Sequence, residues 1–532
     1  MTHPHRLEAA PRRRHSPDDR TEAAVSRADY GGGMTFHEQP LDDADEQEYA
    51  DLHVPADTSM LPIMPIGPRA ENPTAAVERL RAAAKSRAAH PRRMRVHQLR
   101  TMKRMLEENE SRFLDALGHD LGKSPTEGLL TELMPVRAEI DHALLHLTDW
   151  MDKRPVKTPL SLKPATAEVQ ARPKGLVLII GAWNYPLQLV LAPLVAAVAA
   201  GNTVIVSPSE KAPATAAVLR DLLPTYLDSA LISVVAGGKD CNTELLTHPF
   251  DHILYTGGER VGRIVYEAAA KTLTPVTLEL GGKSPVVVTE SRNVMAMARR
   301  IAFGKFTNAG QTCVAPDYVL AVGDAAHEQL VRALPEAIRE FYGEDPRVSN
   351  DYGRLISEEH ASRLQDMLAA DLQDGAQLLV GGRVDAHHRY MAPTVVTGVR
   401  ADHALMQEEL FGPVLPILKV ETFQEALDFI TARPHPLAAY LFTDRPRFHR
   451  AFEEQVQAGA VCTDVTLLHA GLTTLPFGGI GASGIGAYHG ETGFETFSHM
   501  RPSLAKTDQV DTLKVAYPPY TWFKRKALPK ML

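Results

Sequence analysis

Three cysteines have the most versatile chemistry in this 532-residue sequence: Cys241, Cys313 and Cys462. Their number and scattered spacing suit neither a disulfide framework nor a zinc site, so we expect no metal and free thiols in a reducing compartment. A free thiol is either a small buried apolar group or an activated nucleophile that forms covalent intermediates. We expect the first role for Cys241 and Cys462.

Two glycine-rich runs have the spacing of nucleotide-binding loops. The run GGIGASG at 478–484 contains G-x-G-x-x-G, but no acidic residue ends a second strand after it, so we interpret it as a loop at a domain seam. Gly257 and Gly262 have the spacing of a P-loop, yet Arg and Ile at 263–264 replace its Lys and Ser or Thr, which excludes an NTPase. This second run follows a strand and opens a helix, so it either faces an anion with its amides or forms only a structural turn.

The composition is that of an ordinary globular chain. Hydrophobic residues make up 44% and charged residues 23% of the sequence, which argues against collagen-like, coiled-coil and wholly disordered proteins. The formal net charge is -8, so no overall basic field attracts nucleic acid. The first residues lack the apolar region of a secretory signal, and we expect a cytoplasmic protein. Residues 1–70, rich in charge, Pro and Gly, are predicted to form a disordered tail.

The apolar pattern changes from helical to strand-like along the chain. Asn72 followed by Pro is typical of a helix start, and helical periodicity continues from there. Short apolar runs such as Leu176–Ile180 then alternate with helical stretches, which predicts parallel strands with crossover helices in a doubly wound domain. The same alternation resumes after the glycines at 281–282 and predicts a second α/β domain. The segment 157–172 alternates polar and apolar residues and predicts a β-hairpin apart from both.

The uncharged run Gly175–Gly201 is long enough to be mistaken for a transmembrane span. The polar and turn-forming residues 184–186 interrupt it. We therefore predict a buried strand, a tight turn, and a buried helix that begins near Pro186.

Five motifs together resemble those of aldehyde dehydrogenases, and they appear in that family's order. The closing run YHGETGFETFSH and the later YPPY resemble the class 3 branch, which handles fatty and aromatic aldehydes. The five motifs are AWNYP (182–186), VTLELGGKSP (276–285), NAGQTC (308–313), EELFGPV (408–414) and LPFGGIGASGIGAYHG (475–490).

The resemblance implies a fold of three parts and a homodimer. A cofactor domain, a catalytic domain and a small β element for oligomerisation are expected. We assign residues 71–156 and 173–280 to the NAD-binding domain, 281–475 to the catalytic domain, 157–172 and 476–510 to the bridging element, and 511–532 to a C-terminal tail. That tail mixes aromatic and basic residues, and we expect it to pack on a partner subunit rather than touch a membrane.

The resemblance also assigns catalytic roles, and the chemistry of the residues agrees with them. An aldehyde carbon has no spare electron pair with which to expel a hydride, so a nucleophile must first make it tetrahedral, and Cys313 matches the family nucleophile. The Asn184 side chain and the Cys313 backbone N–H match the oxyanion donors. Glu279 matches the base that activates water against the thioester, with its pKa raised by apolar neighbours. The alternatives are an Asn that only satisfies its turn and a solvated strand-end Glu.

For the cofactor, the resemblance implies contacts with the nicotinamide, the riboses and the phosphates. One position departs from the family, because Ser207 stands where a lysine usually precedes Pro-Ser-Glu. Without that ammonium we expect NAD, with NADP bound more weakly and Lys211 as a possible substitute cation. The residues matched to cofactor contacts are Trp183, Ser207, Glu210, Gly257, Gly262, Leu280, Glu409 and Phe411.

The expected reaction is NAD(P)-dependent oxidation of a medium- or long-chain aliphatic or aromatic aldehyde to its carboxylic acid, through a thiohemiacetal and a thioester on Cys313. Three other outcomes stay open from the residues alone. A Cys hydrolase or amidase would need a His or similar group beside the thiol. An acylating enzyme would pass the thioester to coenzyme A and would not need a base at Glu279. A non-catalytic protein could also use the same fold.

Overall fold

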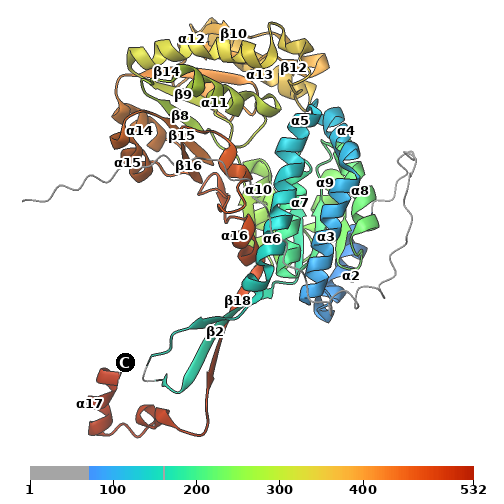
Figure 1. The fold of residues 1–532 in the computed structure, drawn as a ribbon, viewed down its shortest axis with the longest axis vertical. Coiled ribbons are helices and arrows are strands. Elements are labelled where there is room, and N and C mark those ends of the chain that lie inside the picture. The colour runs from blue at the N-terminus through green and yellow to red at the C-terminus, as the bar shows by residue number, and fades with distance from the viewer. Residues whose placement is uncertain (1–70, 160–161, 532) are drawn as a thin grey trace, which may run out of the picture. The chain divides into compact units, whose positions relative to one another are not determined.

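The computed structural model describes residues 71–159 and 162–531, and the tail predicted over 1–70 lies outside them. A block of helices opens this part of the chain (Figure 1). The Asn72 side chain accepts the Ala75 N–H and Pro73 occupies the first helical position, so the predicted helix start is confirmed. The block comprises α2 (Pro73–Ser86), α3 (Arg92–Glu108), α4 (Glu110–Leu121), α5 (Pro125–Gly128), the π-helical turn η1 (Leu129–Leu133) and α6 (Met134–Met151).

The first large sheet has the strand order β17-β7-β6-β3-β4-β5, and all its strands except β17 run parallel. Its central strands are continuous apolar runs because helices cover both faces. The strands are β3 (Leu176–Ile180), β4 (Thr203–Ser207), β5 (Ile232–Val234), β6 (His252–Thr256), β7 (Val276–Glu279) and β17 (Gly484–Ile485). The crossover helices are α7 (Gln188–Ala200), α8 (Pro213–Tyr226), α9 (Gly238–Leu245) and α10 (Glu259–Ala270).

The second large sheet has the order β10-β13-β14-β9-β8-β15-β16, with only β10 antiparallel. The predicted pair of α/β domains is therefore confirmed. Its strands are β8 (Pro285–Val288), β9 (Tyr318–Val322), β10 (Gln377–Val380), β13 (Thr394–Thr397), β14 (Val414–Val420), β15 (Ala438–Phe442) and β16 (Ala460–Thr463). Its helices are α11 (Val294–Phe306), α12 (Gly323–Tyr342), α13 (Glu358–Gln373), α14 (Phe423–Thr431) and α15 (Pro446–Gln455). A two-stranded ribbon of β11 (Val384–Asp385) and β12 (Tyr390–Met391) comes between β10 and β13 in the sequence.

A small antiparallel sheet joins distant parts of the chain in the order β1-β2-β18. In Figure 1, β2 and β18 extend away from the two large sheets. The strands are β1 (Arg154–Val156), β2 (Ala165–Pro173) and β18 (Ser498–Lys506), and α17 (Trp522–Met531) follows.

Three details differ from the sequence expectations. The segment 476–510 is not wholly part of the small sheet, because β17 pairs with β7 and α16 (Gly490–Thr496) packs on α7. Helix α7 begins at Gln188, since Pro186 takes part in the preceding turn. Strand β2 continues to Pro173, one residue into the predicted cofactor domain.

Helix α7 is buried along nearly its whole length, as predicted. None of the helices within residues 71–159 and 162–531 has the length and apolar character that crossing a membrane requires. Helix α8 has no side-chain cap of its own; instead Asp120 of α4 accepts the N–H groups of Ala214 and Thr215 (3.0 and 2.8 Å). This contact attaches the helical block to the first sheet.

Candidate active site

A cavity of about 570 Å³ lies between the two α/β domains and is lined by residues of both. The turns after β3, β6 and β7 contribute to it from the first sheet, where the carboxyl ends of parallel strands usually bind ligands. Its size is typical of a small-molecule site. The cavity brings together Cys313, Glu279 and Asn184, the three residues predicted to act on the substrate.

The loop before Cys313 has an unusual backbone that the surrounding groups hold in place. Asn308 and Ala309 have φ of 55° and 50°, in the left-handed region that non-glycine residues rarely adopt. The Gln311 side chain fixes this turn: its Nε2 donates to the carbonyl of Asn308 (2.9 Å) and its Oε1 accepts the Ile356 N–H (2.8 Å). Strain of this kind persists only where neighbours over-determine the conformation. Cys313 is thereby held, partly buried, in the cavity wall.

Asn184 lies in the turn after β3 and is bonded directly to the cysteine loop. Its Nδ2 donates to the Gln311 carbonyl (3.1 Å), and its own carbonyl accepts bonds from Asn308 Nδ2 (2.8 Å) and Lys123 Nζ (3.1 Å). These bonds tie the two loops at fixed distance. The side-chain amide keeps a second N–H, which is available to a substrate oxygen.

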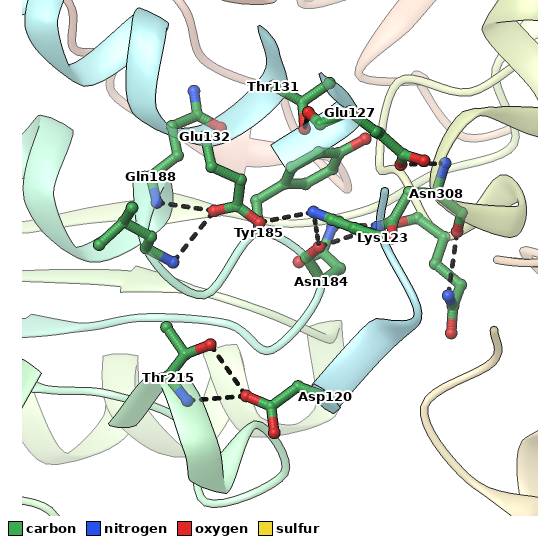
Figure 2. A network of polar contacts seen from close by, with 12 residues as sticks. Asp120, Lys123, Glu127, Thr131, Glu132, Asn184, Tyr185, Gln188, Thr215 and Asn308 are labelled. Atoms are coloured by element: carbon green, nitrogen blue, oxygen red, sulfur yellow. Dashed lines mark hydrogen bonds and ion pairs between the residues drawn. The ribbon is translucent and has the colours of Figure 1, made fainter. Parts of the chain in front are cut away.

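A fully buried ion pair lies behind Asn184 (Figure 2). Lys123 Nζ and Glu132 Oε1 are 2.5 Å apart and both side chains are 0% exposed. The other oxygen of Glu132 accepts the N–H groups of Leu187 and Gln188 (3.1 and 3.0 Å), which belong to the turn that carries Asn184. Lys123 also lies over the ring of Tyr185, 4.0 Å from its centroid. The pair therefore positions the whole turn from the helical block.

A second carboxylate of this block supports the cysteine loop. Glu127 Oε1 accepts the backbone N–H of Asn308 at 2.8 Å, a contact also drawn in Figure 2. Burial raises the pKa of Glu127 to about 6, although the nearby Lys123 opposes the shift. Glu127 and Glu132, which lie in one short helical stretch, thus hold the two loops that carry Cys313 and Asn184, both predicted to be catalytic.

Glu279 ends strand β7 and is almost completely buried, with 2% exposure. Neither carboxylate oxygen has a hydrogen-bond partner among the described residues. Burial raises its pKa well above the usual range for glutamate. The backbone at this point is fixed, because β17 pairs with β7 and the Gly257 N–H donates to the Glu279 carbonyl (3.0 Å). An unpaired buried carboxyl of this kind is suited to accepting a proton.

The surroundings of Cys313 favour the protonated form of its thiol. Burial first, and then the carboxyl groups of Glu409 and Glu279, raise its pKa to about 12, while the backbone N–H groups of Cys313 and Val314 lower it less. Glu409 shares this environment, and burial together with Asp317 raises its pKa to about 8. A nucleophilic thiolate therefore requires a proton acceptor or added positive charge in the cavity.

Phe411, predicted to contact the nicotinamide, has φ of 52° and is held in that conformation from α13. His360 Nε2 donates to the Phe411 carbonyl (2.7 Å), and Arg363 donates to the neighbouring Leu410 carbonyl (2.5 Å). Burial lowers the pKa of His360 to about 4, so the ring is neutral. The Trp183 ring meets Phe411 edge-on at 5.3 Å. The two aromatic residues thus form one corner of the cavity.

The remaining cofactor predictions fall into two groups. Gly257, Leu280 and Glu409 line the cavity. Ser207, Glu210 and Gly262 do not line it. Ser207 is fully buried, and its Oγ has no hydrogen-bond partner in the part of the chain that the structure describes. Glu210 is exposed, and Gly262 packs in α10, where an added Cβ would lie 2.7 Å from Leu280.

The residues that fit the phosphates of a dinucleotide lie at the start of α10. Gly258 is the N-cap, it makes no side-chain cap, and an added Cβ there would meet no atom within 4 Å. Free amides at a helix N-terminus attract anions. The buried hydroxyls of Thr256 on β6 and Ser207 on β4, on either side of β3, have no hydrogen-bond partner among the described residues. The site therefore fits the predicted cofactor.

The sequence did not reveal several of these supporting residues. Lys123, Glu127 and Glu132 occur among other charged residues of the helical block and resemble a solvated helix face. His360 has no motif around it. Asn308 was within a recognised motif, but its role in holding Asn184 depends on a contact between distant segments.

Comparison with known proteins supports the class that this fold and cavity define. The model of the "Aldehyde dehydrogenase family" matches residues 43–502. The chain therefore belongs to the aldehyde dehydrogenase family and is an NAD(P)-dependent enzyme that oxidises an aldehyde to its carboxylic acid.

Its similarity to individual relatives extends over most of each chain. "Aldehyde dehydrogenase family 3 member A2" of Rattus norvegicus is 45% identical over 444 residues, which is 83% of this chain and 90% of the relative. "Aldehyde dehydrogenase, dimeric NADP-preferring" of the same organism is 43% identical and is covered to 97%. A substrate-bound structure of AldH from Staphylococcus aureus is 40% identical, with a TM-score of 0.83 over 86% of this chain and 98% of that one.

The buried ion pair gives a test of how the site is supported. We expect Lys123→Met to reduce stability by about 3–5 kcal/mol, because it leaves the buried Glu132 carboxylate without its cation. Chemical denaturation followed by circular dichroism measures the change. The control is Lys103→Met, which removes the exposed pair with Asp141 (2.6 Å) and should cost at most about 1 kcal/mol. Equal losses in both variants would contradict a special role for the buried pair.

Proposed function

We propose that Cys313 is the nucleophile, Asn184 an oxyanion donor and Glu279 the general base of this dehydrogenase. The observation that carries the proposal is the convergence of a partly buried thiol, a fixed amide and an unpaired buried carboxyl on one cavity. Glu409, Phe411 and the start of α10 would hold NAD(P) beside them, and the bound cofactor would supply the acceptor for the hydride.

In the first half-reaction the Cys313 thiol gives its proton to the ionised carboxylate of Glu279 in the same cavity, and the sulfur attacks the aldehyde carbon. Glu279 then releases this proton to solvent and is again available as a base. The carbonyl oxygen becomes an oxyanion, which the free N–H of Asn184 and the backbone N–H of Cys313 stabilise in a water-poor site. Burial and two carboxyl groups raise the pKa of the thiol, so the protonated form is favoured and the thiol must lose its proton in each catalytic cycle. When the hydride leaves, the C=O bond forms again and a thioester remains on Cys313.

In the second half-reaction water must attack the thioester. Glu279, as the deprotonated base, accepts a proton from that water while the oxygen bonds to the thioester carbon. The carbon–sulfur bond then breaks, the acid leaves, and the Cys313 sulfur takes the proton from Glu279, which regenerates both the thiol and the carboxylate. The raised pKa of Glu279 makes it a stronger base than an ordinary carboxylate.

The wall of the cavity beyond the reacting residues supports an apolar substrate. We propose medium- or long-chain aliphatic or aromatic aldehydes, because this part of the wall is predominantly hydrophobic. The apolar lining includes Leu130, Leu189, Phe303, Leu467, Leu468 and Phe477. A series from acetaldehyde to hexadecanal, with benzaldehyde, assayed by NADH absorbance would define the range.

We also propose a homodimer in the cytoplasm. Strand β18 is an edge strand of nine residues that is mostly exposed, and an uncovered edge of this length favours pairing with another chain. One rat relative bears the word "dimeric" in its name. Light scattering should give twice the 58.3 kDa mass of the chain; a mass of one chain at micromolar concentration would contradict this.

The nucleophile is tested by Cys313→Ser, which should abolish dehydrogenase activity but keep NAD binding, because a hydroxyl is far less ionised than a thiol. Activity is measured by NADH absorbance and binding by fluorescence titration. The control Cys241→Ser changes a half-buried thiol on α9 and should keep normal turnover. Turnover near wild type in Cys313→Ser would exclude the proposed nucleophile.

The base is tested by Glu279→Gln. Hydride transfer does not need the base that activates water, so stopped-flow should show a burst of about one NADH per site followed by a slow steady state. Glu290→Gln changes an exposed glutamate after β8 and should leave both phases unaltered. If coenzyme A restored fast turnover to a wild-type enzyme that water alone barely supported, the acylating reaction would replace the hydrolytic one.

Ser207, at the position where the family usually has a lysine, predicts that this enzyme prefers NAD to NADP. The rat relative, by contrast, is described in its name as NADP-preferring. Ser207→Lys should tighten NADP by more than NAD, because a hydrogen bond to a charged group contributes about 1.5–3 kcal/mol, or roughly ten- to a hundredfold in affinity. Fluorescence titration at one fixed salt concentration measures both dissociation constants. Thr243→Lys, on the exposed side of α9, controls for the added charge. Wild-type protein that binds both cofactors equally would contradict the prediction.

A further inference from the structure

A polar pair that the reaction does not use lies in the wall of the substrate cavity. His489, which directly precedes α16, lines the cavity, and Glu139 of α6 contacts its Nδ1. Both residues are only 3% exposed. The second oxygen of Glu139 accepts the Gly490 N–H at 3.1 Å, so the carboxylate holds the ring and its adjoining backbone together.

The backbone conformation of His489 indicates that the surrounding contacts hold the imidazole ring in its position. Its φ is 88°, in a region that residues with a side chain rarely occupy. The imidazole stacks on the Tyr488 ring at 4.4 Å and lies 5.7 Å from the Phe477 ring. Both aromatic residues also line the cavity. The histidine is therefore fixed in orientation by one carboxylate and two rings.

The remaining ring nitrogen is the chemically informative atom. Nε2 of His489 is buried and has no hydrogen-bond partner among the described residues. A buried polar atom without a partner destabilises the protein, so an apolar side chain would suit this wall better if it served packing alone. With Nδ1 engaged by Glu139, Nε2 is the only polar atom that the ring can offer to a molecule in the cavity.

The pairing with Glu139 restricts which ligand group can bind. In the neutral ring Nδ1 carries the proton and Nε2 is an acceptor; in the protonated ring Nε2 is a donor. A hydroxyl group satisfies both states because it donates and accepts. A carboxylate or phosphate on the substrate would be repelled by Glu139, and an alkyl group would leave Nε2 unpaired.

We propose that His489, oriented by Glu139, is a specificity-determining residue that binds a hydroxyl group on the aldehyde substrate. The enzyme therefore favours hydroxyl-bearing aldehydes over alkyl analogues of the same size. The inference rests on the proposed use of this cavity by the substrate, and it adds a second anchoring point to the one at Cys313.

The experiment compares substrates that differ only in the hydroxyl. Suitable pairs are 3- and 4-(hydroxymethyl)benzaldehyde with 3- and 4-ethylbenzaldehyde, and 8-hydroxyoctanal with nonanal. The measured quantity is the ratio of kcat/KM between the members of each pair. We expect at least one pair to favour the hydroxyl compound about five- to tenfold in the wild type, and His489→Phe to lose that factor.

Further variants separate recognition from structural damage. His489→Gln keeps an amide that can donate and accept, and it should retain part of the preference even if His489→Phe fails to fold. Glu139→Gln should reduce the ratio, because the ring loses its charged partner. The control is His469→Phe: both nitrogens of this buried histidine are also unpartnered, but it does not line the cavity, so the ratio should be unchanged.

The outcomes distinguish this inference from the proposed function. If the wild type oxidises nonanal in a Cys313-dependent manner but every ratio is one or below, the His489 proposal is wrong and the proposed function stands. If Cys313→Ser still oxidises nonanal, the proposed function itself fails. A preference that persists in His489→Phe would also overturn the proposal.

Discussion

The buried contact between Lys123 and Glu132 is the interaction on which the arrangement of the site depends. Charges removed from water are unfavourable unless each finds several partners, and here both do. The ammonium also bonds to the Asn184 carbonyl, and the carboxylate also accepts two amides of the turn that follows. If either group moved, the other would remain as an unpaired buried charge. The turn that carries Asn184 is therefore held rigidly against the helical block.

Around this scaffold, burial largely sets the protonation states of the acidic groups that line the cavity. It raises the pKa values of Cys313, Glu279 and Glu409 together. A neutral resting site has an advantage for an enzyme with a reactive thiol, because a protonated cysteine resists oxidation and unwanted alkylation. Reactivity then depends on what enters the cavity.

The sequence predicted those features that depend on local patterns. Leu176–Ile180 was identifiable as a buried strand because its apolar run is continuous. The motifs around Cys313 and Glu279 resemble those of aldehyde dehydrogenases, and the roles proposed for these residues rest on that resemblance. The supporting residues were not identifiable in this way. Glu139 and His489 lie 350 residues apart in the sequence, and Lys123, between α4 and α5, looks like any surface lysine until its partners are known. Their significance arises from tertiary contacts, which periodicity does not report.

The short pairing of β17 with β7 has a consequence for how the protein is assembled. Strand β7 ends with Glu279, and β17 comes from a segment far along the chain that also leads to Tyr488 and His489. Contacts between such distant segments carry a large loop-closure cost and form late in folding. An intermediate that lacks β17 would contain the cysteine loop, but neither the fixed position of Glu279, the proposed base, nor the part of the cavity wall formed by Tyr488 and His489. Completion of the fold and acquisition of activity should therefore coincide in time.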